Sequence, residues 1–174
     1  MAIKQVIVVR KQYPDNKGGL KQIQVGKEMA QVAHASLAFL TRRIQKQLEA
    51  ERGKIVYVDK INPKDPLAPP VKVPASFLGG REPKKIKDIF SKAELEWMIE
   101  VPGEKSFAKI VLQCDSEEEL IKIYEKAKAA GLESHLIIDS GATEFHGIPT
   151  KTCVGIGPDE AEKIDAITGS LKLR

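Results

Sequence analysis

The stretch Gly26-Lys27-Glu28-Met29-Ala30-Gln31-Val32-Ala33-His34-Ala35-Ser36 places a lysine at the start of a predicted helix and follows it with small residues. Upstream, Gln5-Val6-Ile7-Val8-Val9-Arg10 is an apolar, β-branched run, which predicts a buried strand. Open α/β sheets bind their ligands at the carboxyl ends of their strands. We therefore expect Lys27 to stand beside the carboxyl end of this first strand.

The helix that contains Lys27 is predicted to run from about Gly26 to about Leu48. Its apolar and small side chains recur at helical spacing, and short side chains let a helix lie close to a sheet. The residues expected to pack on the sheet are Met29, Val32, Ala33, Ser36, Leu37 and Leu40. A polar stripe of Lys27, Gln31 and His34 is expected to point toward a ligand, although a lone histidine among alanines is more often a packing residue.

Three further strands are each predicted by an apolar run, over residues 107–114, 134–139 and 152–157. Helices are predicted over residues 91–99, 116–130 and 158–168, and the first two begin with the serine and glutamate of a capping box. Strands that alternate with helices indicate the α/β class. We expect a mixed sheet of mainly four strands, with helices on both of its faces.

The composition predicts one domain over residues 1–174, because 174 residues with 42% hydrophobic content suffice for a single core. The formal charge of +4 suits a nucleic-acid partner without requiring one. Both cysteines, Cys114 and Cys153, lie in apolar runs and lack metal-type spacing with the histidines, so we expect reduced, buried thiols. No segment has the length or composition of a signal peptide or a membrane span, which predicts a soluble, unexported protein.

The candidate site combines an acid with two threonines. Asp139 closes an apolar strand before a glycine-containing turn, so its carboxylate is expected either at a ligand-binding sheet edge or in an Asx-turn. If this strand runs parallel to the first, Asp139 and Lys27 share one edge. Thr143 and Thr152 flank the following loop, where threonines are usually only strand formers. With no phosphate loop, serine elbow or metal set in the sequence, direct attack by water is the most economical chemistry.

Five blocks of the sequence resemble the type 2 peptidyl-tRNA hydrolases of archaea and eukaryotes. They are V-I-V-V-R from Val6, G-K-x-x-A-Q-V-A-H-A from Gly26, I-x-D-x-G-x-T from Ile137, T-x-T-C-V-G-I-G-P from Thr150 and K-I-D-x-I-T-G-x-L-K-L from Lys163. The resemblance implies a three-layer α/β/α sandwich that forms a homodimer in the cytoplasm. It also implies hydrolysis of the ester between peptide and tRNA, with no cofactor, metal or membrane partner.

By the same resemblance, the catalytic residues fall on Lys27, Asp139, Thr143 and Thr152. We expect Asp139 to orient or deprotonate water, the threonines to position water or the acyl group, and Lys27 to hold phosphate or the oxyanion. The residues expected to bind substrate are Gly26, Gln31, His34, Lys17 and Lys21. The alternative function is a non-catalytic tRNA- or protein-binding module of the same fold.

The chain departs from the family pattern in two loops and in one insertion. The loop before Lys27 is longer and lacks a customary basic residue, which Lys17 or Lys21 replaces in our interpretation. The loop between Thr143 and Thr152 is one residue longer. Compact relatives have little or nothing at residues 50–87, a segment rich in prolines that ends in the basic cluster Lys84-Lys85-Ile86-Lys87. This insertion is either a tRNA-facing flap or surface decoration, and long insertions in loops cost little free energy.

Overall fold

The structure is a computed structural model that describes residues 2–15, 17–52, 55–58, 71–74, 89–99 and 107–174. Contacts divide the chain into two compact units, Met1–Leu40 with Phe90–Arg174, and Thr41–Ile89. The first unit contains the large sheet and every residue of the candidate site. The second unit contains the last turns of the long helix and a small hairpin, and the basic cluster at residues 84–87 lies outside the described residues.

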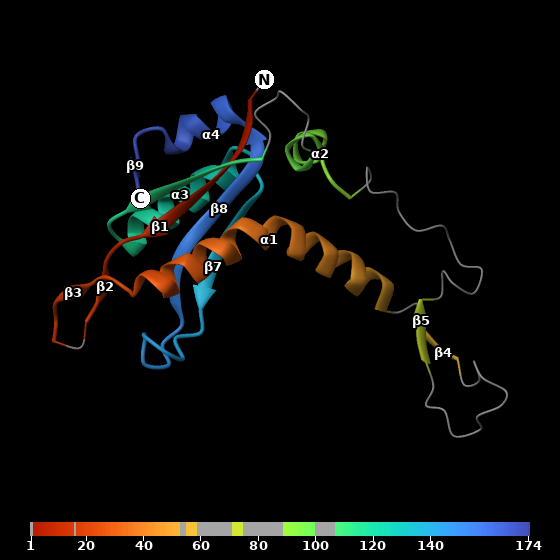
Figure 1. The fold of residues 1–174 in the computed structure, drawn as a ribbon, viewed down its shortest axis with the longest axis horizontal. Coiled ribbons are helices and arrows are strands. Elements are labelled where there is room, and N and C mark those ends of the chain that lie inside the picture. Colours follow the sequence, from red (N-terminus) through yellow and green to blue (C-terminus); the bar gives the residue numbers. More distant parts are fainter. Residues whose placement is uncertain (1, 16, 53–54, 59–70, 75–88, 100–106) are drawn as a thin grey trace. The chain divides into compact units, whose positions relative to one another are not determined.

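The sheet of the first unit has five strands in the order β7-β8-β1-β6-β9 (Figure 1). Their bounds are Ile3–Arg10 for β1, Ala108–Cys114 for β6, Ser134–Asp139 for β7, Thr150–Glu160 for β8 and Lys172–Leu173 for β9. Strands β1 and β6 are parallel, whereas β8 runs antiparallel to both β1 and β7. Four strands are those predicted. The fifth, β9, was missed because two residues are too short for an apolar pattern.

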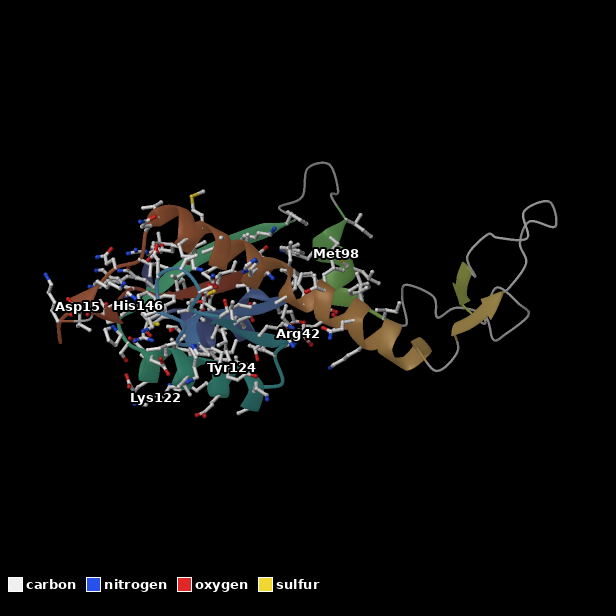
Figure 2. The ribbon with its side chains drawn as sticks, turned by 90° about the horizontal axis from the view of Figure 1, so that it is seen from below. Asp15, Arg42, Met98, Lys122, Tyr124 and His146 are labelled. Carbon is white, nitrogen blue, oxygen red and sulfur yellow. The ribbon has the colours of Figure 1, made fainter. Side chains whose placement is uncertain are left out.

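Strand β1 lies in the middle of the sheet, and its apolar run is continuous because both of its faces are covered. Val6 and Val8 pack under helices α3 (Glu117–Ala129) and α4 (Ala161–Thr168). Ile7 and Val9 pack under helix α1 (Val25–Arg52), on the opposite face. Figure 2 shows Lys122 and Tyr124 of α3 on the side of the sheet away from α1. The predicted three-layer arrangement is therefore confirmed.

The shorter elements follow the capping and strand patterns closely. Helix α2 (Lys92–Met98) has the full capping box, in which Ser91 and Glu94 bond each other's backbone amides. Helix α3 has half of it, because Ser116 accepts from the Glu119 amide while Glu119 itself bonds the amide of Asp115. The remaining strands are β2 (Tyr13–Pro14) with β3 (Leu20–Lys21), and β4 (Ile55–Val58) with β5 (Val71–Pro74).

The predicted packing face of α1 is wrong in part, because Met29, Ala33 and Leu37 are exposed. The buried positions of the first unit's part of the helix are Gln31, Ala35, Ser36, Ala38 and Phe39. The cause is a close approach of α1 to β8, where the backbone of Ala35 lies directly above Gly155. This approach rotates the buried face by about one residue from the face that apolar spacing selected.

The close approach at Gly155 predicts a stability effect. A Cβ atom added there would lie 2.5 Å from the Ala35 carbonyl oxygen, so Gly155→Ala should lower the free energy of unfolding by about 1–3 kcal/mol. Gly26→Ala is the matched control, since a Cβ atom at Gly26 meets no other atom within 4 Å. Urea unfolding of both variants measures the difference, and equal stability would contradict the close packing of α1 on β8.

Candidate active site

The candidate site lies at the sheet edge where β7 ends beneath the first turn of α1. Since β1 and β7 both run antiparallel to β8, they are parallel to each other, as the shared-edge expectation required. Lys27 Nζ lies 2.5 Å from Asp139 Oδ2. The same ammonium donates to Thr143 Oγ1 at 3.3 Å. Three of the predicted residues therefore meet around one cation.

Gln31 connects this group to Thr152, the fourth predicted residue. Its side-chain Nε2 donates to Asp139 Oδ2 at 2.7 Å, and its Oε1 accepts from Thr152 Oγ1 at 2.8 Å. Gln31 is only 2% exposed and Thr152 is fully buried. The polar stripe expected on α1 therefore includes a buried residue, Gln31, whose side chain connects Asp139 to Thr152 inside the protein.

The carboxylate of Asp139 is held in its ionised form. Burial acts to raise its pKa, but Lys27, the backbone amide of Gly141 and the Gln31 amide outweigh burial and hold the pKa below its usual range. Gly141 N donates to Asp139 Oδ1 at 2.8 Å, so both carboxylate oxygens have donors. A carboxylate that is stabilised in this way is a weak proton acceptor at neutral pH.

The site has an accessible surface and a buried support. Thr143 is exposed and the Lys27 side chain is partly exposed, whereas Asp139, Gln31 and Thr152 lie behind them. The Lys27 ammonium and the Thr143 hydroxyl are already positioned at the surface. They can therefore bind an oxyanion, or polarise a carbonyl group, without first rearranging. The arrangement therefore suits reactions in which negative charge develops on an oxygen.

The other residues expected at the site come from the β2–β3 hairpin and from α1. Lys21 Nζ donates to the backbone oxygen of Glu144 at 3.0 Å, which joins β3 to the loop after β7. Lys17 is exposed in the turn between β2 and β3, where its amide bonds the Asp15 side chain. Figure 2 shows Asp15 and His146 at the same end of this unit. Gly26 and His34 are exposed on α1.

Comparison with known proteins identifies a family that this chain matches. A family model described as "Peptidyl-tRNA hydrolase PTH2" matches residues 77–174, which include Asp139, Thr143 and Thr152. The chain belongs to this family. Lys27 and Gln31 precede the matched region, so the family match does not cover them. Their contacts with Asp139 join them to the matched part of the site.

Curated archaeal proteins named "Peptidyl-tRNA hydrolase" are similar to this PTH2 chain. The protein from Methanopyrus kandleri is 47% identical over 78 residues, which are 45% of this chain and 62% of that protein. The protein from Methanocaldococcus jannaschii is 49% identical over 78 residues, 45% of this chain and 63% of that protein. The matched segment thus spans less than two thirds of the length of these relatives.

The PTH2 chain also supports its site with residues that the sequence analysis missed. Tyr13, Ile23 and Phe145 form a small buried cluster between the β2–β3 hairpin and the loop after β7. The Tyr13 hydroxyl donates to the backbone oxygen of Thr152 at 3.4 Å. Tyr13 sits among prolines, glycines and lysines, so its segment resembled an ordinary loop. The feature that could have identified Tyr13 is its large aromatic side chain, which follows a buried strand.

An ion-pair group lies beside this cluster. Arg10 is buried at the end of β1 and bonds Glu117 at 2.6 Å, and Lys151 bonds the other oxygen of Glu117 at 2.7 Å. A buried arginine requires a paired charge, so Arg10 at the end of an apolar run was the signal for this group. The ion pairs hold the start of α3 against β1 and β8, next to the candidate site.

Neither a candidate metal centre nor a candidate membrane helix is found among the described residues. Within them, no three His, Cys, Asp or Glu side chains are grouped so that they could hold a metal ion. Nor does any described helix combine the length and apolar character needed to cross a membrane. Cys114 and Cys153 are free and buried, and burial raises the pKa of each thiol to about 12. Both thiols are therefore poor nucleophiles.

Proposed function

We propose that this PTH2-family chain hydrolyses peptidyl-tRNA, splitting the ester between the peptide and the terminal ribose and so recycling tRNA from stalled translation. Membership of the family and the names of its archaeal relatives support this activity. The observation that carries the proposal is the continuous bonding from Thr143 through Lys27, Asp139 and Gln31 to Thr152. All four residues expected to be catalytic belong to this one group.

In the proposed reaction, water attacks the ester carbonyl carbon, and its proton passes to the ribose oxygen that leaves. Lys27 stabilises the oxyanion that forms on the carbonyl oxygen, or holds a nearby phosphate. Thr143 positions the water or the acyl group at the exposed side of Lys27. Asp139 orients Lys27 and the water, because its lowered pKa makes it a weak base at neutral pH.

Thr152 acts on the reaction through Gln31 in this proposal. Its hydroxyl is buried and donates to the Gln31 side chain, which in turn donates to Asp139. Two donors then fix the direction of Oδ2, one from Gln31 and one from Lys27. Such support restricts the carboxylate to one orientation before substrate arrives.

The tRNA partner is proposed to lie over the exposed residues around this site. Lys17 and Lys21 come from the β2–β3 hairpin, and Gly26 and His34 come from α1. Lys17 has the exposure that a phosphate contact needs, while the Lys21 amine already bonds the Glu144 carbonyl. We further propose a cytoplasmic homodimer that works without a cofactor, each copy being one domain interrupted by the insertion at about residues 50–87.

A deacylation assay tests this function. The chain should release the N-blocked amino acid from a blocked aminoacyl-tRNA, and Thr143→Val should slow that release about 10-fold or more because a positioning hydroxyl is lost. Thr41→Val is the matched control, since Thr41 is exposed on α1 and belongs to the second compact unit, not to the unit that holds the site. Binding of tRNA without any release would favour the non-catalytic binding module instead.

A further inference from the structure

Two aromatic rings stack at the start of β6, and the outer ring of the pair is exposed. Phe107, the residue before β6, stacks on Trp97 of α2 with ring centroids 4.3 Å apart and planes inclined by 20°. Trp97 is 2% exposed, whereas Phe107 is 51% exposed. Phe107 also has a φ of 63°, in the left-handed region that large side chains rarely adopt. The backbone is therefore strained at the residue that presents this ring to solvent.

Two further contacts fix the inner ring of the stack. Trp97 Nε1 donates to the backbone oxygen of Ala108 at 3.0 Å. The ring of Phe39, from α1, packs edge-on against Trp97 with centroids 5.9 Å apart. Phe107 thus rests on a ring that is held by both a hydrogen bond and a packing contact. A support of this kind fixes the outer ring before any ligand binds, which lowers the entropy lost on binding.

Lys109 adds a positive charge at the side of the stack. Its Nζ lies 4.3 Å from the Phe107 centroid and 5.3 Å from the Trp97 centroid. A cation over the outer face of Phe107 would lie farther from Trp97, so Lys109 leaves that face uncovered. Lys109 is exposed, and no acid among the described residues forms an ion pair with it. Its charge is therefore available to an anionic ligand.

An open aromatic face beside an unpaired cation matches the chemistry of an unpaired nucleotide. Aromatic side chains bind unpaired bases by stacking on them, and basic side chains alongside bind the phosphates of the same strand. The formal charge of +4 on the whole chain also suits RNA. An apolar protein surface fits less well, because it would desolvate the Lys109 ammonium without giving it a partner.

We propose that Phe107 is a stacking site for an unpaired base of RNA, and that Lys109 binds the phosphate next to that base. This rests on the proposed function, because peptidyl-tRNA supplies the RNA. Lys109 pairs with Gln5 near the start of β1, whereas the candidate active site lies at the carboxyl end of β1. Figure 1 shows α2 at the end of the sheet where β1 begins, away from the β2–β3 hairpin. The two ends of β1 are about 20 Å apart, so the stacked base is remote from the ester.

Titration with uncharged tRNA tests the stacking. Phe107→Leu keeps an apolar side chain but removes the aromatic face, so it should raise the dissociation constant of tRNA about 10-fold. Phe107→Tyr keeps the ring and should restore the wild-type affinity. Leu173→Ala is the matched control, since Leu173 is 74% exposed on β9, which pairs with the other end of β6. It should bind tRNA as the wild-type chain does.

The salt dependence of tRNA binding tests the role of Lys109. Lys109→Gln should weaken binding and reduce the slope of log Kd against log salt concentration by about 1, because one phosphate contact is lost. Lys122→Gln is the control, since Lys122 is exposed on α3, which Figure 2 shows on the side of the sheet away from α1. Its slope should equal that of the wild-type chain. An unchanged slope in Lys109→Gln would remove the phosphate contact from the proposal.

Trp97 fluorescence distinguishes an unpaired base from other ligands, because Trp97 is the only tryptophan of the chain. A single-stranded oligoadenylate of about ten nucleotides should change this fluorescence. An RNA duplex of the same length should not, because its bases are already paired and stacked. An equal response to both RNAs would overturn the stacking site.

Deacylation kinetics separate this proposal from the proposed function. Phe107→Leu should raise the KM for blocked aminoacyl-tRNA more than it lowers kcat, because a remote binding contact is lost. An active chain whose tRNA affinity is the same in Phe107→Leu would overturn the stacking site and leave the function standing. A chain that binds tRNA through Phe107 but releases no amino acid would overturn the proposed function alone.

Discussion

Asp139→Asn is expected to lower the rate of peptidyl-tRNA hydrolysis by about 10²–10⁴-fold while it leaves tRNA affinity nearly unchanged. The asparagine has the same size and keeps one acceptor oxygen, so the turn at Gly141 is retained. It loses the negative charge that Lys27 faces and replaces one acceptor by an NH₂ group. That NH₂ group meets either the Gln31 amide or the Gly141 amide, both of which are donors. Single-turnover deacylation and a filter-binding titration measure the two effects.

Asp115→Asn is the control for this substitution, because Asp115 is an exposed acid just before α3. It should leave turnover unchanged. Loss of tRNA binding together with turnover in Asp139→Asn would assign the carboxylate to substrate binding, and unchanged turnover would remove it from the proposed mechanism.

The lowered pKa of Asp139 gives the same variant a second readout. A carboxylate whose folded pKa is depressed contributes stability above its unfolded pKa of about 3.9, and that contribution is lost as the pH falls through the folded pKa. The free energies of unfolding of Asp139→Asn and of the wild-type chain should therefore become more similar as the pH falls below about 4. Thermal unfolding across this range measures it, and a constant difference at every pH would mean that the ion pair with Lys27 adds no stability.

The strands and helices were predictable where burial imposes a simple pattern. A central strand such as β1 is covered on both faces and must be continuously apolar, and β8 gives the same signal. Strand β6 and the edge strand β7 are shorter apolar runs that are only partly buried. Capping residues such as Ser91 and Ser116 mark helix starts because they bond specific backbone amides. In contrast, β9 is two residues that pair with β6, and pairing of that kind leaves no periodic pattern in the sequence.

The packing face of α1 was not predictable because two faces of the helix are apolar. Periodicity finds apolar residues at helical spacing but cannot say which of two neighbouring faces meets the sheet. The choice depends on Gly155, more than one hundred positions along the chain from α1, whose lack of a side chain admits the Ala35 backbone. The exposed face then keeps Met29 and Leu37, the residues that looked like core.

Sequence patterns brought Lys27 and Asp139 to one sheet edge, but they did not predict how deeply Gln31 and Thr152 are buried. Lys27 and Asp139 could be placed together only on the condition that β7 runs parallel to β1, and β8 between them satisfies that condition. Gln31 falls one helical turn after Lys27, which placed it on the correct side of α1. Its burial, and its link between Asp139 and Thr152, depend on how close α1 lies to the sheet. Sequence spacing does not contain that distance.

Gln31→Leu is expected to lower turnover about 10²-fold and the free energy of unfolding by about 1–3 kcal/mol. Leucine is of similar size but can neither donate to Asp139 nor accept from Thr152. The buried Thr152 hydroxyl then keeps only the Ile137 carbonyl, at 3.4 Å, as a backbone acceptor. Asp139 retains Lys27 and Gly141 but can turn away from its present orientation. Deacylation rates and urea unfolding measure the two losses.

Gln31→Glu tests whether Gln31 orients the Asp139 carboxylate or only fills space between α1 and the sheet. The new carboxylate stands within hydrogen-bonding distance of Asp139 Oδ2, where Gln31 Nε2 is now at 2.7 Å, so two like charges compete for one place. The pair should hold one proton with a raised pKa, which makes this variant less stable as the pH rises through that pKa. Its stability and turnover should improve on moderate acidification, whereas those of Gln31→Leu should not.

Gln113→Glu is the control, since Gln113 accepts from Arg174 on the surface and its replacement should not show this pH dependence. If Gln31→Glu shows the same pH dependence as Gln31→Leu, Gln31 fills space and does not direct Asp139.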